Sequence, residues 1–268
     1  MFTEYKEDNV KLYDPVKVSD EVKKLVTRYS GNIEERKYFR FRGGRWYGGI
    51  SSADVIGCNL KCKFCWAWYF RDRYDLGFYL SPEAAYERLV RIAFKGGYKY
   101  LRLTGGEPTL SKTHLLNLLK LNDEEHKHIF ILETNGILLG VDETFSKELA
   151  KFNNVLVRVS FKGTTPEEFS LLTGAEPTAF LYQFKAVENL INAGLKPGRE
   201  VVVAAMIGFS SDENIAKFTL KIAEISEELL DIDWEYVIMY PHVEKILKKY
   251  RLTPTKSVHP GKIPDDMV

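Results

Sequence analysis

The sequence has 268 residues, of which 45% are apolar and 28% charged, a composition typical of a globular domain and not of a disordered or fibrous chain. Its 38 Lys and Arg residues nearly balance 37 Asp and Glu residues, and the net charge of +1 does not signal a polyanionic partner. No apolar run approaches the roughly 18 residues of a membrane span, and the start lacks the order of a signal peptide. We therefore expect a cytoplasmic protein that does not bind a membrane.

Short β-branched or aromatic runs alternate with segments of helical period along the chain, and this unit occurs six times. Before the first unit, a helix is expected near residues 19–30. Ser81-Pro82-Glu83 gives the clearest helix signal, an N-cap followed by a first-turn proline and an acid, and the helix should end at Gly96-Gly97. The expected strands are residues 46–56, 99–103, 128–133, 155–161, 200–207 and 234–240.

Strand followed by helix, repeated, predicts a parallel sheet in an α/β fold. A closed barrel has eight such units in about 250 residues. Six units therefore predict a partial, open β/α barrel, with a doubly wound sheet as the alternative. We expect residues 46–250 to form this barrel and residues 1–45 a short N-terminal extension that packs on it. Residues 251–268 are expected to form an irregular C-terminal tail that orders on substrate binding.

All three cysteines, Cys58, Cys62 and Cys65, lie within eight residues, directly after the first expected strand. This spacing suits a metal site, because thiolates bind zinc and iron–sulfur clusters. A closed structural site needs four protein ligands, and the sequence has no fourth cysteine. Either His114 or His126 completes a Cys3His zinc site, or the three thiolates hold an iron–sulfur cluster with one open iron.

The pattern Cys-x3-Cys-x-aromatic-Cys, with Phe64 as the aromatic residue, resembles the hallmark of radical S-adenosylmethionine (SAM) enzymes. The resemblance covers roughly residues 48–240. It implies that the three cysteines bind a 4Fe-4S cluster and that SAM is the second cofactor. Gly105, Gly106 and Glu107 look like the family motif that holds the amino group of the SAM methionine.

The resemblance implies further cofactor-binding residues. Glu133 and Asn135 belong to a segment similar to one that ends the third strand of the glycyl-radical-enzyme activases and the deazaguanine synthases. Ser160 and Lys162 share a face of their strand, because the strand period is two, and they resemble the polar contacts to the SAM ribose and carboxylate. The sequence is equally consistent with Lys162 as a solvated lysine at the end of its strand. Met206 is assigned to the adenine side, although such a residue is usually core.

These positions all fall at the carboxyl ends of different expected strands, which is the face that carries the chemistry in β/α barrels. The resemblance implies that a reduced cluster cleaves SAM to a 5'-deoxyadenosyl radical, which abstracts a hydrogen from the substrate. No catalytic residue is assigned beyond the cluster ligands. An electron donor such as ferredoxin or flavodoxin is expected.

The lack of further cysteines counts against subfamilies with auxiliary clusters, the molybdopterin-precursor synthases among them. The segment 172–175 and the helix at 186–195 look activase-like. We therefore expect a single-cluster enzyme closest in style to the glycyl-radical-enzyme activases, acting on an unknown small molecule or on a protein glycyl site.

A basic stretch between residues 36 and 45 interleaves cations with aromatic residues. Such a pattern is used to bind RNA, but in a strand it is more simply a charged outer face over an aromatic inner face. RNA is therefore the less favoured substrate, and a tRNA-modifying radical SAM enzyme is the alternative. The alternative of another class is a non-catalytic zinc or iron–sulfur RNA-binding protein. The cations are Arg36, Lys37, Arg40, Arg42 and Arg45.

Overall fold

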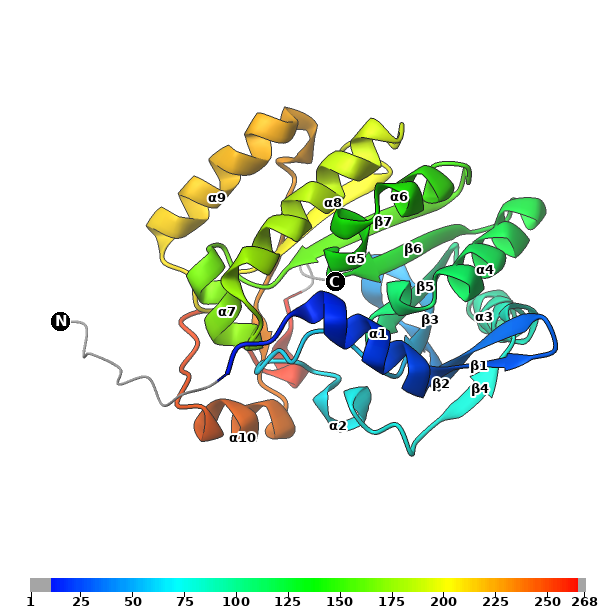
Figure 1. Cartoon of the computed structure of the whole chain (residues 1–268), viewed down its shortest axis with the longest axis horizontal. Coiled ribbons are helices and arrows are strands. Elements are labelled where there is room, and N and C mark those ends of the chain that lie inside the picture. The colour runs from blue at the N-terminus through cyan, green and yellow to red at the C-terminus, as the bar shows by residue number, and fades with distance from the viewer. Residues whose placement is uncertain (1–10, 265–268) are drawn as a thin grey trace.

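The computed structural model of the chain describes residues 11–264, and six parallel strands form the body of its sheet (Figure 1). Their spatial order follows the chain order, and each strand pairs with the next in parallel. A doubly wound sheet reverses its strand order at a switch point, and this sheet does not. The predicted six-unit open barrel is confirmed. The strands are β3 (Ile50–Val55), β5 (Tyr100–Gly105), β6 (Ile129–Thr134), β7 (Val155–Phe161), β8 (Val201–Met206) and β9 (Asp233–Glu235).

The crossover helices cover the outer face of this sheet, and Figure 1 shows α4, α6, α8 and α9 on the same side of it. The predicted cap at Ser81 is present, since its side chain accepts a hydrogen bond from the Ala84 amide at 3.3 Å. The helices are α3 (Pro82–Gly96), α4 (Lys112–Glu125), α5 (Ile137–Val141), α6 (Glu143–Leu149), α7 (Pro166–Thr173), α8 (Phe180–Asn192) and α9 (Asp212–Ile225).

The central strand β7 shows how the two faces of the sheet differ. Val157, Val159 and Phe161 are fully buried, and the ring centroid of Phe161 lies 4.8 Å from that of Phe184 on α8. Between them, Arg158 and Ser160 line the cavity on the inner face. The period of two therefore separates an apolar core under the helices from a polar barrel interior.

The N-terminal segment extends the sheet. Helix α1 (Pro15–Val26) begins and ends four residues earlier than expected, because Asp14 caps it and Pro15 occupies its first turn. After α1, strand β1 (Thr27–Ser30) pairs with β2 (Ile33–Gly44), and β2 runs antiparallel to β3. Strand β4 (Phe78–Leu80) pairs with the other edge of β2.

The prediction that the basic stretch forms a charged outer face is wrong. A bulge between Tyr38 and Arg40 changes the alternation of β2, and beyond it Arg40 and Arg42 line the cavity. Arg36 is only 1% exposed and donates to the backbone carbonyls of its neighbours. The bulge could not be read from the regular spacing of the cations.

The carboxyl-terminal part extends the chain beyond the last strand of the barrel. The expected sixth strand divides in two: β9 pairs with β8, whereas β10 (Val237–Ile238) pairs with β11 (Ser257–Val258). Helix α10 (Pro241–Lys249) lies between β10 and β11, and a 3-10 turn covers Pro260–Lys262. No helix in the described residues is both long and apolar enough to cross a membrane.

Candidate active site

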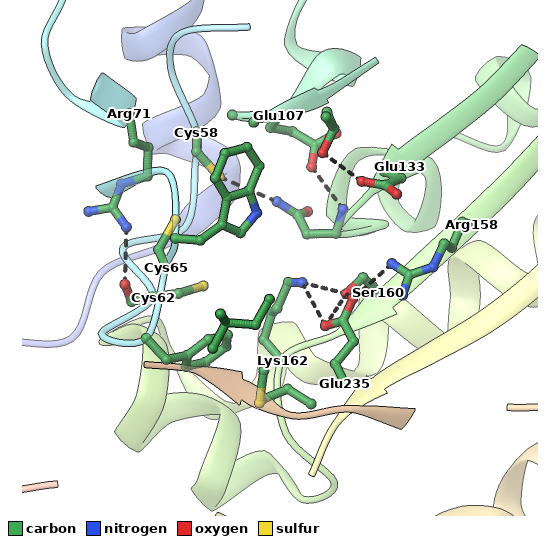
Figure 2. A pocket seen from close by; sticks show the side chains of 18 of the residues that line it. Cys58, Cys62, Cys65, Arg71, Glu107, Glu133, Arg158, Ser160, Lys162 and Glu235 are labelled. Carbon is green, nitrogen blue, oxygen red and sulfur yellow. Dashed lines mark hydrogen bonds and ion pairs between the residues drawn. The ribbon is translucent and has the colours of Figure 1, made fainter. Parts of the chain in front are cut away.

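A cavity of about 740 Å³ opens at the inner face and carboxyl ends of the strands, a volume in the range of small-molecule sites. Polar side chains from β5, β6, β7 and β9 and the cysteine loop point into it (Figure 2). The structure brings every residue that the sequence placed in the site to the wall of this one cavity. They are Cys58, Cys62, Phe64, Cys65, Gly105, Gly106, Glu107, Glu133, Asn135, Ser160, Lys162 and Met206.

The loop that carries the cysteines is fixed by hydrogen bonds to three other parts of the chain. The Lys63 amide donates to the Leu172 carbonyl on α7 at 2.9 Å, and the Asn59 side chain donates to Ser19 on α1 at 3.0 Å. The Glu107 amide donates to the Gly57 carbonyl at 2.7 Å. These contacts hold the three thiols on one side of the cavity before any metal binds.

The thiols lie in a buried environment that also supplies N–H donors. The Leu60 amide and the Asn135 side chain approach the Cys58 sulfur at 3.4 and 3.8 Å. Burial raises the pKa of the Cys58 thiol to about 12 and that of Cys62 to about 11. Iron binding therefore displaces protons from both thiols, and N–H donors to sulfur are a recognised means of tuning an iron–sulfur cluster.

The prediction that His114 or His126 completes a zinc site with the three cysteines is wrong. His114 donates through Nδ1 to the Glu34 carbonyl at 2.9 Å and accepts at Nε2 from the Tyr38 hydroxyl at 2.7 Å, outside the cavity. His126 is exposed at the end of α4. Within residues 11–264, no three His, Cys, Asp or Glu side chains are arranged to hold a single metal ion.

A 4Fe-4S cluster fits the same donor set. Each of its thiolate ligands binds a different iron, so the sulfurs do not need to converge on one point. Three cysteines on the wall of one cavity would hold three irons and leave the fourth without a protein ligand. An amino acid chelates such an open iron through its amino nitrogen and carboxylate.

The turn after β5 packs against the cysteine loop and requires glycine. A Cβ on Gly106 would lie 2.2 Å from the Gly57 carbonyl oxygen, and Gly105 has a φ of 95°. The turn places the Glu107 carboxylate in the cavity wall, only 2% exposed. Its Oε1 accepts from the Thr109 hydroxyl and the Thr134 hydroxyl, both at 2.7 Å. The backbone amide of Asn135 donates to Oε2 at 2.8 Å, which leaves a lone pair on Oε2 for an ammonium.

Charged pairs cross the inner face from strand to strand. Arg102 on β5 contacts Glu133 on β6 at 3.1 Å, and the Thr104 and Tyr47 hydroxyls donate to the same carboxylate at 2.6 and 3.3 Å. Burial raises the pKa of Glu133, but Arg102 and Arg158 outweigh it and hold that pKa below its ordinary value.

Glu235 on β9 is the centre of a second group of charges (Figure 2). Arg158 and the Ser160 hydroxyl donate to it at 2.8 Å, and the Lys162 ammonium lies 3.6 Å away. Although burial raises the pKa of Glu235, Lys162 and Arg158 lower it to about 2. Burial opposes the charge of Lys162, yet Glu235 keeps the pKa of this lysine above its ordinary value. Lys162 is therefore not a solvated strand-end lysine.

The sequence reasoning missed several residues that line the cavity. Arg102 and Arg158 occupy inward positions of buried strands, and a charge at such a position was the available signal. Glu235 gave no signal, because its partners lie more than 70 residues away in the chain. Arg71 lies buried beside the cysteines and donates to the Cys62 carbonyl at 3.2 Å and to Asp72.

Comparison with known proteins gives the class of this chain. Residues 55–221 match the model of the radical SAM superfamily, and the chain belongs to that superfamily. It is thus a radical SAM enzyme, of a superfamily that uses a 4Fe-4S cluster and SAM. The alternative of a non-catalytic zinc or iron–sulfur RNA-binding protein is wrong.

Its relatives include proteins named probable GTP 3',8-cyclase. The protein of this name from Sulfurisphaera tokodaii is 27% identical over 200 residues, which are 72% of this chain and 61% of the relative. The one from Thermococcus kodakarensis is 35% identical over 121 residues, 44% of this chain and 36% of the relative. The chain matches about 60% of the length of the first of these curated relatives.

Solved structures share the fold. SuiB from Streptococcus suis bound to S-adenosylmethionine matches with a TM-score of 0.52 and 20% identity, over 79% of this chain and 52% of SuiB. The FeFe-hydrogenase maturase HydG from Carboxydothermus hydrogenoformans matches with a TM-score of 0.53 and 15% identity, over 80% and 56%.

Proposed function

We propose that this enzyme cleaves SAM reductively at a cluster held by Cys58, Cys62 and Cys65, and abstracts a hydrogen from a polar small molecule in the same cavity. A cluster held by these cysteines would supply one electron and an open iron, and the C–S bond of SAM that this electron breaks would give methionine and the 5'-deoxyadenosyl radical. The protein must bind both molecules, orient them and exclude water. A ferredoxin or flavodoxin is the proposed electron donor.

The residues around the cysteine loop support SAM binding. Glu107 retains a free lone pair at Oε2 for the methionine ammonium, and charge-assisted hydrogen bonds of this kind are the strong ones. Lys162 provides a partly buried cation for the carboxylate, and Met206 gives apolar contact for the adenine. Because Lys162 and Ser160 both contact Glu235, SAM would compete with that carboxylate for them.

The observation that best supports a polar small-molecule substrate is the charged inner face of the barrel. Closed β/α barrels fill their interior with bulky branched side chains, whereas here Arg102, Glu133, Arg158 and Glu235 line an open cavity. Burial of unpaired polar groups is costly, so a ligand that replaces water there must itself make hydrogen bonds. The curated relatives named for a reaction of GTP also support a small-molecule substrate.

RNA is a less favoured substrate than a small molecule, because the cations of the basic stretch do not form a surface stripe. Arg36 is buried, and Arg40 and Arg42 pair with the buried Asp54 inside the cavity. A protein glycyl site would have to reach the same cavity, whose wall also includes His242 of α10 and Ile263.

The test is anaerobic reconstitution followed by turnover with dithionite. We expect about four irons per chain and formation of 5'-deoxyadenosine from SAM without any substrate. Production should then rise on addition of a polar small molecule, with GTP as the first compound to try and tRNA as the comparison. Failure to cleave SAM would refute the proposal, and stimulation by tRNA alone would refute its small-molecule part.

A further inference from the structure

Strand β2 presents two arginines to the cavity at the open edge of the barrel. Arg40 lies opposite Asp54 and Arg42 opposite Ser52 in the antiparallel register with β3. Two residues apart, they share one face of the strand, and the bulge after Tyr38 turns that face inward. Their side chains are 42% and 26% exposed, so both guanidinium groups are accessible from the cavity.

One carboxylate serves both arginines. Asp54, which is fully buried, accepts from Arg40 Nε at 2.6 Å and from Arg42 Nε and Nη2 at 3.1 Å each. Two positive charges against one negative charge leave a surplus of one. Because Asp54 binds each arginine through Nε, it also fixes the direction in which the outer nitrogens point.

The outer nitrogens have unused donors. Across residues 11–264, Arg40 Nη1 and Nη2 and Arg42 Nη1 make no hydrogen bond, although a guanidinium has five N–H groups. The other arginines of the cavity wall each have a carboxylate of their own: Arg71 pairs with Asp72, Arg102 with Glu133, and Arg158 with Asp233 and Glu235.

We propose that Arg40 and Arg42 bind an oxyanion of the substrate, a phosphate or a carboxylate group. Paired guanidinium forks match the geometry of both groups. The SAM carboxylate is not this anion, because its proposed partner Lys162 follows β7, which β3, β5 and β6 separate from β2 in the sheet. The inference rests on the proposed function and adds to it the charge and position of one substrate group.

The experiment measures anion binding without turnover. Reconstituted enzyme saturated with SAM, with no reductant, is titrated calorimetrically with inorganic pyrophosphate and separately with succinate. We expect at least one of them to bind, and the one that binds more tightly identifies the group. Arg40→Gln should weaken this binding roughly tenfold or more, and Arg40→Lys by less, because Lys keeps the charge without the fork.

The matched control is Arg28→Gln. Arg28 lies on β1, pairs with Glu35 at 2.5 Å and is outside the cavity, so its loss should leave anion binding unchanged. Arg40→Gln retains the contact between Arg42 and Asp54, so the buried carboxylate keeps a partner. If the variant nevertheless fails to fold, phenylglyoxal labelling of the wild-type enzyme tests the same point.

Pyrophosphate or succinate should slow the labelling of Arg40 and Arg42 but not that of Arg28. No binding of either anion, equal binding by Arg40→Gln, or equal labelling with and without the anions would overturn the inference. Cleavage of SAM with dithionite needs no substrate, so it separates the two proposals. An enzyme that cleaves SAM but binds neither anion would refute this inference alone.

Discussion

The carboxylate of Glu107 accepts a hydrogen bond from the hydroxyl of Thr134 at 2.7 Å, and this contact joins the carboxyl ends of β5 and β6. The Thr109 hydroxyl and the backbone amide of Asn135 donate to the same carboxylate. Glu107 therefore holds together the two turns that flank the cysteine loop, in addition to its proposed contact with the SAM ammonium.

Glu107→Gln should consequently affect both stability and SAM affinity. The amide has one acceptor oxygen in place of two, so a buried donor loses its partner at a cost of about 1–3 kcal/mol in the free energy of unfolding. Loss of a charge-assisted bond should weaken SAM binding by about 1.5–3 kcal/mol. Denaturant unfolding and SAM titration of the reconstituted protein measure the two effects.

Thr134→Val is the matched control for Glu107. It removes one hydroxyl donor but keeps the carboxylate and its charge. We expect lower stability with SAM affinity within a factor of two of the wild type. Unchanged SAM affinity in Glu107→Gln would remove this residue from the SAM site and leave it a purely structural role.

Replacement of Cys58, Cys62 or Cys65 by Ala should abolish both the cluster and SAM cleavage. The sequence has no spare cysteine to replace a lost thiolate. Iron and sulfide content, together with 5'-deoxyadenosine production, measure the outcome for each variant. A single variant with a full cluster and wild-type production would contradict the assignment of that residue.

The sequence predicted the barrel strands correctly because the patterns that define a strand or a helix cap depend on neighbouring residues alone. The six strands and the cap at Ser81 follow from period and capping, which neighbouring residues determine. The bulge in β2 and the division of the sixth strand depend on pairing with distant segments, β3 and β11. The motif residues were found in the same way, whereas Glu235 acquires its role only when β9 lies beside β8.

Arg71→Met should lower the reduction potential of the bound cluster. The Arg71 side chain is buried beside the cysteines and contacts the Cys62 carbonyl, and a nearby positive charge favours the more negative reduced cluster. Spectroscopic redox titration of the reconstituted protein measures the change. The control is Arg73→Met, since Arg73 is exposed and pairs with Asp75. Equal potentials in the wild type and Arg71→Met would show that Arg71 only supports the loop.

His114 should make the stability of the protein depend on pH between about 6.5 and 4. Burial lowers its pKa from 6.5 to about 4. The unfolded chain therefore binds a proton in this range that the folded chain does not, and stability falls as the pH falls. The loss is roughly 3 kcal/mol over the whole range. Urea unfolding at several pH values should show a flatter profile for His114→Gln, and an identical profile would contradict this role.

Glu235→Gln should lower the free energy of unfolding at neutral pH, and the variant should then lose less stability than the wild type as the pH falls. Its folded pKa is about 2 and its ordinary value is 4.5, so its contribution is complete above pH 4.5 and disappears as the pH falls toward 2. In the variant Lys162 loses its carboxylate partner and keeps only its contact with the Ser160 hydroxyl, whereas Arg158 keeps Asp233, and we expect a cost of about 2 kcal/mol at pH 7.

The difference between Glu235→Gln and the wild type should therefore shrink steadily as the pH falls from 4.5 toward 2. Denaturant unfolding over this pH range measures it. Glu87→Gln is the matched control, because Glu87 pairs with Arg91 on the exposed face of α3 and its loss should leave the profile of the wild type unchanged. A constant difference at all pH values would mean that Glu235 acts through its shape, and not through the charges of Arg158 and Lys162.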